Sequence, residues 1–319
     1  MRQGDMILDY DVIIVGGGPA GLTAGIYLAR GKRRVLILDK EAFGGLVKNI
    51  EWIENYPGFS EGVSGPKLAS EMVNQAIRWG AQLEQREVLE IDSFSTCKSI
   101  NCADHKGYTC DVVIIAGGSR PKKLGVPGED KFQNNGIIQC ATCDGARFNG
   151  RVVAVCGGGD AGISEALYLT NLASKVILIE NQPSLTGTAI LQERAHANSK
   201  LEIRCGEEVV EISGGDHVQA VLVVDVTTGV REIVHVDGVL IHVGIEPSTG
   251  YLKGFLTLDG QGQILVNDWL ETAVAGVLAA GDIRYGSARQ VAAAVGDGAI
   301  AAIAAERLLS TGRYSLSRC

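Results

Sequence analysis

Two cysteines, Cys140 and Cys143, lie three positions apart in the segment Cys-Ala-Thr-Cys-Asp-Gly, and Asp144 follows them directly. Among the eight cysteines of the chain, this is the one pair with the spacing of a metal or redox site. A zinc ion would need two further ligands at sensible spacing, and the other cysteines are irregularly spaced, at positions 97, 102, 110, 156, 205 and 319. Buried structural thiols are a second alternative. Because Cys-x-x-Cys spacing permits a small disulfide ring and a lowered thiol pKa, the segment favours a redox dithiol and no metal site.

A glycine-rich turn between a strand and a helix predicts a dinucleotide site near the N-terminus. The apolar strand Asp11–Val15 leads into Gly16–Gly21, and apolar residues at helical spacing follow over 22–30. The next strand, Val35–Leu38, ends in Asp39. Glycines at such a turn let a pyrophosphate approach the helix N-terminus, and the acid accepts hydrogen bonds from an adenosine ribose. A glycine pattern alone is weak evidence, but here the strand, turn, helix and acid occur together.

The same unit occurs a second time further along the chain. A strand over 151–156 leads into the turn Gly157–Gly162, a helix is predicted over 163–172, and a strand over 176–179 ends in Glu180. In both copies 18 residues separate the last glycine from the acid, and eight positions are identical between 16–40 and 157–181. The repeat predicts two similar nucleotide-type domains. A second copy that binds nothing remains the alternative.

The composition is that of an ordinary globular protein. The chain has 319 residues, 46% of them hydrophobic and 21% charged, which suggests about two domains. Its 29 basic and 37 acidic side chains give a net charge of −8, which argues against general nucleic-acid binding. No apolar run approaches the ~20 residues of a membrane span, and the N-terminal segment has no apolar stretch of signal-peptide length. We expect a cytoplasmic protein that binds neither nucleic acid nor membrane.

The order of segments indicates that the second domain is inserted into the first. Between the repeats we predict a strand at Val88–Asp92, a hairpin over 99–109 and a buried strand over 111–116. Linkers are predicted at Arg120–Pro127 and Ile245–Thr249, and the two crossings would act as a hinge pair. An apolar segment over 273–282 and an Ala-rich helix over 288–309 follow. The prediction is an α/β fold with two Rossmann-like dinucleotide-binding domains. Residues 1–122 and 245–319 form the first domain, and 123–244 form the second, which carries the Cys-x-x-Cys segment.

These motifs resemble the low-molecular-weight thioredoxin reductases over essentially the whole chain. The matching segments are Gly16–Gly21, Gly44-Gly45, Glu54–Gly58, Cys140–Gly145, Gly157–Gly162 with Glu165, and 279–282 followed by Arg289-Gln290. The resemblance implies a flavoenzyme that binds FAD on its first repeat, forms a homodimer and reduces a thioredoxin-like protein. It also implies that Cys143 faces the flavin, that Cys140 attacks the substrate disulfide, and that Asp144 transfers protons.

The resemblance and the local chemistry together give a candidate FAD site. Asp282 follows an apolar strand and Ala-Ala-Gly, so its carboxylate can accept hydrogen bonds from ribityl hydroxyls. Helix N-terminal amides near Gln290 and Val291 would stabilise negative charge at the pyrimidine end of the flavin. Asn55 takes its role from the resemblance alone, because turn chemistry also explains Asn-Tyr-Pro-Gly. The candidate cofactor-binding residues are Gly16, Gly18, Pro19, Ala20, Gly21, Asp39, Lys40, Gly44, Gly45, Leu46, Asn55, Val88, Ala116, Gly117, Gly281, Asp282, Arg289, Gln290, Val291 and Tyr314.

Three departures from the family pattern concern the electron donor and the flavin. The family holds the 2′-phosphate of NADPH with a His-Arg-Arg triplet and a further arginine, whereas residues 179–185 read Ile-Glu-Asn-Gln-Pro-Ser-Leu, with no basic residue before Arg194. Leu46 replaces the glutamine of a Gly-Gly-Gln flavin motif, and a tail with Tyr314 extends past the last helix. Similar features mark a branch that is independent of pyridine nucleotides, some members of which are reduced by ferredoxin. In that branch a C-terminal aromatic residue covers the flavin.

The leading hypothesis is therefore a flavin-dependent protein-disulfide reductase whose donor is ferredoxin or another carrier rather than NADPH. An ordinary NAD(P)H-dependent thioredoxin reductase and a non-catalytic flavin and dithiol redox sensor remain alternatives. The larger glutathione reductase relatives are excluded, because they carry their dithiol near the N-terminal flavin strand and add an interface domain. A basic cluster formed by Arg30, Lys32, Arg33 and Arg34, to which Lys122, Lys123 and Arg147 add charge, would steer an acidic carrier towards the protein. A solvated turn at 32–34 is the alternative.

Overall fold

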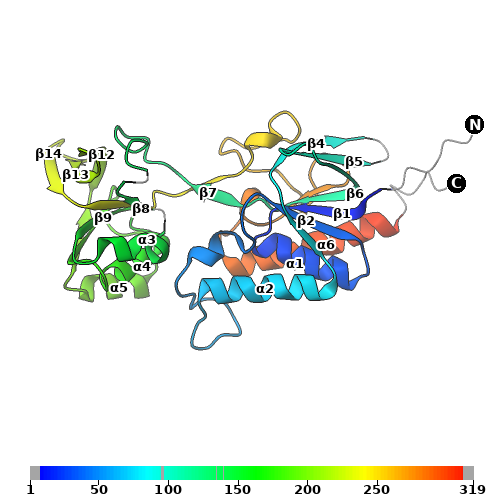
Figure 1. Cartoon of the computed structure of the whole chain (residues 1–319), viewed down its shortest axis with the longest axis horizontal. Coiled ribbons are helices and arrows are strands. Elements are labelled where there is room, and N and C mark those ends of the chain that lie inside the picture. Colours follow the sequence, from blue (N-terminus) through cyan, green and yellow to red (C-terminus); the bar gives the residue numbers. More distant parts are fainter. Residues whose placement is uncertain (1–7, 95–96, 134, 139, 312–319) are drawn as a thin grey trace, which may run out of the picture. The chain divides into compact units, whose positions relative to one another are not determined.

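The computed structural model describes residues 8–94, 97–133, 135–138 and 140–311, without the side chain of Cys143. Tyr314, a candidate flavin contact, therefore lies outside the described residues (Figure 1). The chain divides into two units, one formed by Met1–Arg120 with Glu246–Cys319 and the other by Pro121–Ile245. Two strands at the crossings, β7 (Ser119–Pro121) and β16 (Ile245–Pro247), pair with each other.

The first unit is built on a mixed sheet of seven strands in the described part of the chain, in the order β3-β2-β1-β6-β5-β4 with β17 beside β6. Strands β3, β2, β1, β6 and β17 are parallel, and the β4–β5 and β5–β6 pairs are antiparallel. The predicted hairpin is formed by β5 and the first part of β6, and the predicted buried strand is the last part of the same strand β6, which pairs there with β17. The strands are β1 (Tyr10–Val15), β2 (Val35–Asp39), β3 (Gln82–Gln85), β4 (Val88–Ser93), β5 (Lys98–Cys102), β6 (Gly107–Ile115) and β17 (Val277–Ala279).

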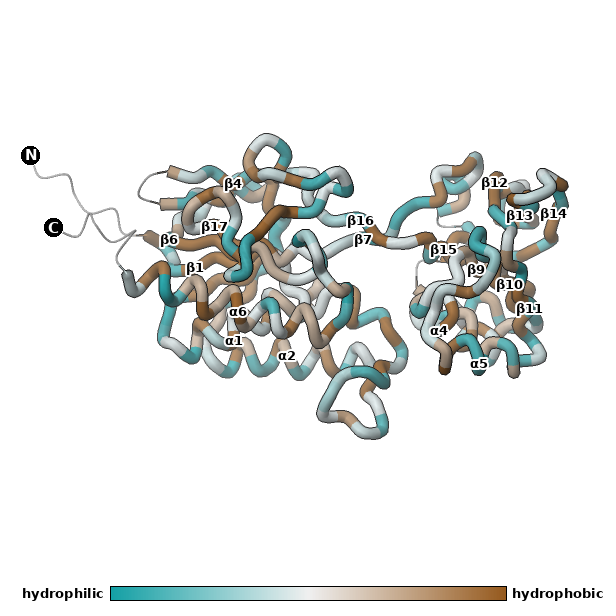
Figure 2. Tube along the Cα trace, turned by 180° about the vertical axis from the view of Figure 1, so that it is seen from behind, coloured by the Kyte–Doolittle hydropathy of each residue, from teal (hydrophilic) through white to brown (hydrophobic). Residues whose placement is uncertain are grey.

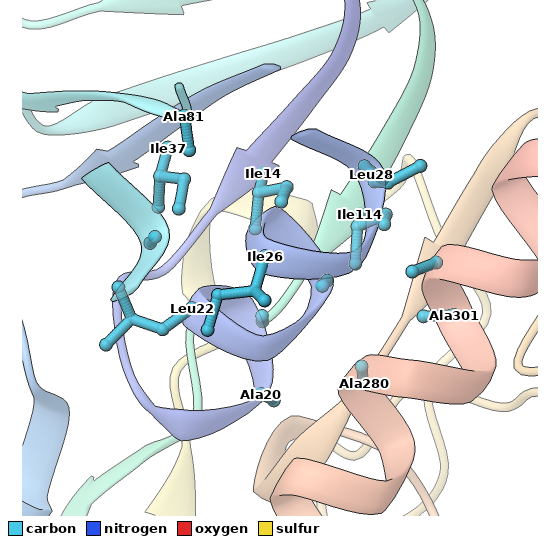
Figure 3. Packing of buried hydrophobic residues seen from close by; sticks show 14 of the residues in the cluster. Ile14, Ala20, Leu22, Ile26, Leu28, Ile37, Ala81, Ile114, Ala280 and Ala301 are labelled. Carbon is cyan, nitrogen blue, oxygen red and sulfur yellow. The ribbon is translucent and has the colours of Figure 1, made fainter. Parts of the chain in front are cut away.

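Three helices cover one face of this sheet, α1 (Pro19–Arg30), α2 (Gly65–Trp79) and α6 (Val291–Ser310), and Figure 1 shows them below the strands. Leu22 and Ile26 of α1 belong to the same buried cluster as Ile14 and Ile114 of the strands and Ala301 of α6 (Figure 3). The small side chains of α6 allow it to approach α1 closely. This core fixes the N-terminal ends of α1 and α6 relative to the strands.

The other face of the same strands is also buried. Successive strand side chains point to opposite faces, so Val15, Leu38 and Ile115 form a second core with Leu252 and Ile283. The latter two lie in the short helices η3 (Gly250–Leu252) and η4 (Gly281–Ile283). Figure 2 accordingly shows hydrophobic residues along much of β1 and β6. Because both faces are covered, polar ligands are expected beyond the carboxyl ends of the parallel strands.

The second unit has a parallel sheet in the order β11-β10-β9-β15-β8 and a separate antiparallel sheet in the order β12-β13-β14. Its strands are β8 (Ile137–Ile138), β9 (Val152–Cys156), β10 (Lys175–Glu180), β11 (Leu201–Cys205), β12 (Glu207–Gly214), β13 (Val218–Asp225), β14 (Arg231–His235) and β15 (Gly238–Ile241). The helices of this unit are α3 (Ala141–Asp144), η2 (Gly145–Phe148), α4 (Asp160–Leu169) and α5 (Ala189–Ala197). In both units a strand, a glycine turn, a helix and a parallel strand follow one another.

The predicted α/β fold with two Rossmann-like units is confirmed. Both of the helices predicted after the second turn and at the end of the chain are present, with shifted ends: α4 spans Asp160–Leu169 against a prediction of 163–172, and α6 begins at Val291, a few residues after the predicted start near 288. No sequence pattern predicted α2, α5, β3, β11 or β14. In the part of the chain that the structure describes, no helix has both the length and the apolar character needed to span a membrane.

Candidate functional site

The first glycine turn, between β1 and α1, closes onto Asp39 at the end of β2. The Gly17 amide donates a hydrogen bond to Asp39 Oδ2 at 2.7 Å, and Asp39 Oδ1 accepts another from the Glu41 amide at 2.9 Å. Gly16 has a φ of +114°, and a Cβ there would collide with the carbonyl oxygen of Ala116, so the turn requires glycine. The half-buried carboxylate is thereby fixed beside the turn with lone pairs left to accept from a ribose.

A second backbone segment, Gly44-Gly45, borders this turn. The Gly44 amide donates to the Gly17 carbonyl at 2.8 Å. Apart from its chain neighbours, the nearest atom to a Cβ built on Gly18 would be the Cα of Gly45, at 3.7 Å, so no side chain lies within that distance. Gly18 lies directly before Pro19, where α1 begins, and helix N-terminal amides attract phosphate groups. The glycine backbone and the helix N-terminal donors fit the pyrophosphate of a dinucleotide.

Asp282 lies in η4, in the loop that leads to α6, and its carboxylate has lone pairs that accept no hydrogen bond from the described residues. Among the described residues the carboxylate accepts one hydrogen bond, from Ser287 Oγ at 3.0 Å. Burial raises the pKa of Asp282. It does not cap α6, because the N-cap position is Gln290 and no side chain bonds there. A half-buried carboxylate with spare lone pairs is suited to a chain of hydroxyl groups, such as the ribityl group of a flavin.

An ion pair that the sequence analysis missed holds this loop against α6. Asp297, which is buried in α6, accepts hydrogen bonds from the Gly281 amide at 2.9 Å and from Arg284 Nε and Nη2 at 2.6 and 2.8 Å. The hydrogen bonds that Arg284 donates to Asp297 raise the pKa of Arg284. The available signal was an acidic residue within a helix of alanine, glycine and other apolar residues, which is rarely buried without a partner.

Two further candidates, Asn55 and Gln290, meet in the structure although they are far apart in the sequence. Asn55 Nδ2 donates to Gln290 Oε1 at 3.1 Å, directly before the first residue of α6, Val291. The Arg289 amide donates to Ser287 Oγ at 3.2 Å, which links this end of α6 to the loop of Asp282. The remaining described candidates of the first unit are Ala20 and Gly21 in α1, Lys40 after β2, Leu46 in the short helix Gly45–Asn49, Val88 at the start of β4 and Gly117 after β6.

The second glycine turn repeats the backbone geometry of the first. Gly157 has a φ of +113°, and a Cβ there would collide with the carbonyl oxygen of His242. The carboxylate of Glu180 accepts hydrogen bonds from the Gly158 amide at 2.5 Å and the Gln182 amide at 2.9 Å. The Thr186 amide donates to the Gly158 carbonyl at 2.9 Å, as Gly44 does to Gly17 in the first turn. The repeat therefore extends to the segment that follows the acid.

The side chains around the second turn nevertheless differ from those of the first. Glu180 is only 7% exposed, whereas Asp39 is half-buried. His242 occupies the position in the second turn that Ala116 occupies in the first, because the carbonyl oxygen of each lies next to the first glycine of its turn. The acid at the end of β10 is thus more covered, and a larger side chain follows β15.

The dithiol segment lies in the second unit, and Cys140 is buried with 5% exposure. Cys140 Sγ lies 3.0 Å from Thr142 Oγ1, and the Asp144 amide donates to the Cys140 carbonyl at 3.0 Å. Cys143 belongs to α3, and its side chain lies outside the described part of the structure. No group of three or more metal-ligating side chains occurs among the described residues.

Glu165 of α4 connects the dithiol segment to β15. Its Oε2 accepts a hydrogen bond from the Ala141 amide at 2.9 Å, and its Oε1 lies 3.2 Å from His242 Nε2. Glu165 belonged to the matched family segment, whereas His242 was missed. No motif predicts that Glu165 and His242 contact each other.

The basic cluster predicted at Arg30–Arg34 is present, but most of its cations have partners in the structure. Arg33 forms an ion pair with Glu306 at 2.5 Å, Arg34 forms one with Asp11 at 2.7 Å, and the guanidinium of Arg30 stacks over Trp79. The segment also precedes β2, so it lies at the amino ends of the parallel strands, opposite to the glycine turn. Three of the four cations are therefore engaged, and none lies near the candidate cofactor site.

Comparison with known proteins places these features in a family. The pattern of the pyridine nucleotide-disulphide oxidoreductase family matches residues 10–298. The thioredoxin reductase of Bacillus subtilis is 40% identical over 294 residues, which cover 92% of each chain. The crystal structure of Lactococcus lactis thioredoxin reductase superposes with a TM-score of 0.93 at 35% identity, over 95% of this chain and all of that one. A ferredoxin-flavin thioredoxin reductase from Clostridium acetobutylicum gives a TM-score of 0.51 at 30% identity, over 94% of this chain and 98% of that one.

Proposed function

The chain belongs to the low-molecular-weight thioredoxin reductases, which are FAD-dependent disulfide oxidoreductases, and we propose that it reduces a thioredoxin-like protein with electrons from a donor other than NADPH. Ferredoxin or a similar carrier is the proposed donor, and a homodimer is the proposed assembly. The first glycine turn with Asp39 would hold the adenosine and pyrophosphate of FAD, and Asp282 with the start of α6 would hold the flavin end. The glycine backbone at Gly18 before α1 and the spare lone pairs of Asp282 support this placement.

The dithiol would carry the reducing equivalents to the substrate. FAD, when bound, supplies an electron pair to a disulfide. With both cysteines reduced, the Cys140 thiolate attacks one sulfur of the substrate disulfide and forms a mixed disulfide. Cys143 then displaces the substrate sulfur, so that the substrate leaves with two thiols and a Cys140–Cys143 disulfide remains. Asp144 would supply and remove the proton at the thiol pair.

The surroundings of Cys140 set a condition for this reaction. The residue Cys140 is 5% exposed, so the dithiol segment has to open before a protein disulfide can reach its sulfur. Glu165 would position the segment, because it holds the Ala141 amide from α4. The same burial favours a second candidate, a redox sensor in which the dithiol reports the state of the flavin and transfers nothing further.

The observation that carries the donor proposal is the chemistry at the end of β10. A 2′-phosphate brings about two negative charges, and each charge-assisted hydrogen bond to it is worth roughly 1.5–3 kcal/mol. Residues 181–193 contain no basic side chain, so two such contacts are lost. That loss amounts to about 3–6 kcal/mol, or roughly 10²–10⁴ in affinity. The buried carboxylate of Glu180 would repel the phosphate further.

The test is anaerobic stopped-flow reduction of the flavin by NADPH, NADH and reduced ferredoxin, each added separately. We expect rapid reduction by ferredoxin and no saturable reduction by NADPH at micromolar concentrations. Saturable bleaching by micromolar NADPH would assign the protein to the ordinary NADPH-dependent reductases, and the same result with NADH would identify Glu180 as a functional ribose ligand.

A second measurement separates the reductase from the sensor. After photochemical reduction of the flavin, we expect repeated reduction of a thioredoxin disulfide under continued illumination, with many thiols formed per flavin. A single turnover that stops at the internal disulfide would favour the sensor.

A further inference from the structure

The hydroxyl group of Tyr251 is buried and has no hydrogen-bond partner among the described residues. Its side chain packs against the second core of the first unit, on the sheet face that carries Val15, Leu38 and Ile115. Buried hydroxyls almost always have a partner in native proteins, so a specific exception calls for an explanation. A missing ligand is one such explanation.

The position of this hydroxyl connects it to the first glycine turn. A Cβ built on Gly117, directly after Ala116 at the end of β6, would lie 4.0 Å from Tyr251 Oη. Burial raises the pKa of Tyr251, and the nearby carboxylate of Asp39 raises it further. The phenol is therefore protonated at physiological pH and can donate a hydrogen bond. Both neighbours, Gly117 and Asp39, belong to the candidate cofactor site.

We propose that Tyr251 is an additional cofactor-binding residue whose hydroxyl donates a hydrogen bond to the adenosine half of FAD. Asp39 marks the adenosine end, because the acid at the end of the second strand accepts from the ribose in this type of fold. Asp282 and Gln290 mark the flavin end, at the start of α6. The inference rests on the proposed placement of FAD on the first turn. No glycine or acidic pattern points to Tyr251, which follows Gly250 in a segment without a motif.

The test compares Tyr251→Phe with Tyr108→Phe as a matched control. Tyr108 lies in the same unit, and its hydroxyl donates to Glu84 at 2.7 Å. The FAD dissociation constant of each apoprotein is measured by quenching of flavin fluorescence, and each apoprotein is melted without FAD. We expect Tyr251→Phe to weaken FAD binding about tenfold, the effect of one hydrogen bond, without lowering the melting temperature of the apoprotein. Tyr108→Phe should lower the melting temperature and leave the dissociation constant unchanged.

Competition with fragments of the cofactor locates the contact. ADP, which carries only the adenosine half, should also bind about tenfold more weakly to Tyr251→Phe, whereas binding of riboflavin should not change. Equal FAD binding by Tyr251→Phe and wild type would overturn the proposal, and would indicate that a water satisfies the hydroxyl. Weaker FAD binding with unchanged ADP binding would refute the adenosine assignment.

A second variant probes the same space from the other side. The methyl group of Gly117→Ala would lie 3.4 Å from Ile283 Cδ1 and 4.0 Å from Tyr251 Oη, which are ordinary contacts. We expect this apoprotein to melt like wild type and to bind ADP more weakly; unchanged ADP affinity would show that no ligand occupies this space. If the wild-type protein binds neither FAD nor ADP, the proposed placement of FAD is wrong. If wild type binds both and Tyr251→Phe binds them equally well, only the role of Tyr251 is wrong.

Discussion

The ion pair between Asp297 and Arg284 is expected to stabilise the first unit and its flavin loop together. Both side chains are largely buried, with 7% and 19% exposure. Removing one partner of a buried pair leaves an uncompensated charge, which costs about 3–5 kcal/mol. In a unit of this size, each kcal/mol lowers the melting temperature by about 2–4 °C. Asp297→Ala should therefore lower the melting temperature of the first unit by roughly 6–20 °C.

The matched control is Glu246→Gln, which removes the exposed partner of Arg120 in the same unit. These two side chains are 43% and 68% exposed, and such pairs contribute about 0–1 kcal/mol. Melting is followed by circular dichroism on the apoprotein, and FAD affinity is measured in parallel. We expect Asp297→Ala to weaken FAD binding as well, because Asp297 also holds the Gly281 amide beside Asp282. Equal small shifts in melting temperature for the two variants would refute the reasoning.

Three further outcomes are expected. Cys140→Ser and Cys143→Ser should both abolish thioredoxin reduction, and a long-wavelength absorbance band of a thiolate against the flavin should appear only in Cys140→Ser; the opposite pattern would reverse the assigned roles. Lys32→Glu should leave the salt dependence of flavin reduction by ferredoxin unchanged, since the Arg30–Arg34 segment is remote from the cofactor site; a lost salt dependence would restore the steering patch. The hydrogen bond from Tyr108, together with Arg86 and Lys106, lowers the pKa of Glu84 to about 2. The stability this shift contributes is present above the unfolded pKa near 4.5 and is lost as the pH falls towards 2, so Glu84→Gln should flatten the fall in melting temperature measured across that range.

Elements with a strong local pattern could be predicted from the sequence. Both glycine turns have a strand before them and an acid after them, and each of these features is local in the sequence. The contact between Asn55 and Gln290 has no local pattern, because 235 positions separate the two residues. Only the family resemblance indicated that both belong to the cofactor site. Strand β14 was missed because its residues, 231–235, alternate weakly and it gains its place by pairing with β13.

The charge pattern of a segment does not show which of its cations are paired, because their partners can come from distant segments. Arg30, Lys32, Arg33 and Arg34 read as a basic cluster, yet the partner of Arg33 is Glu306, at the end of α6. Composition cannot show this pairing, because it depends on the packing of α6 against α1. Tyr251 illustrates the reverse case, since an ordinary tyrosine in the sequence becomes distinctive only when its hydroxyl is found buried and unpartnered.

The two glycine turns together show why equal spacing does not mean equal ligands. The backbone bonds of Asp39 to Gly17 and of Glu180 to Gly158 are equivalent, so both acids serve first to hold the turn. The number of carboxylate lone pairs that a ligand can reach depends on burial, and Glu180 is only 7% exposed. A carboxylate that is both bonded to two amides and covered has little capacity left for ribose hydroxyls. The second turn therefore repeats the backbone geometry of the first, but it presents a carboxylate that is more covered than that of Asp39.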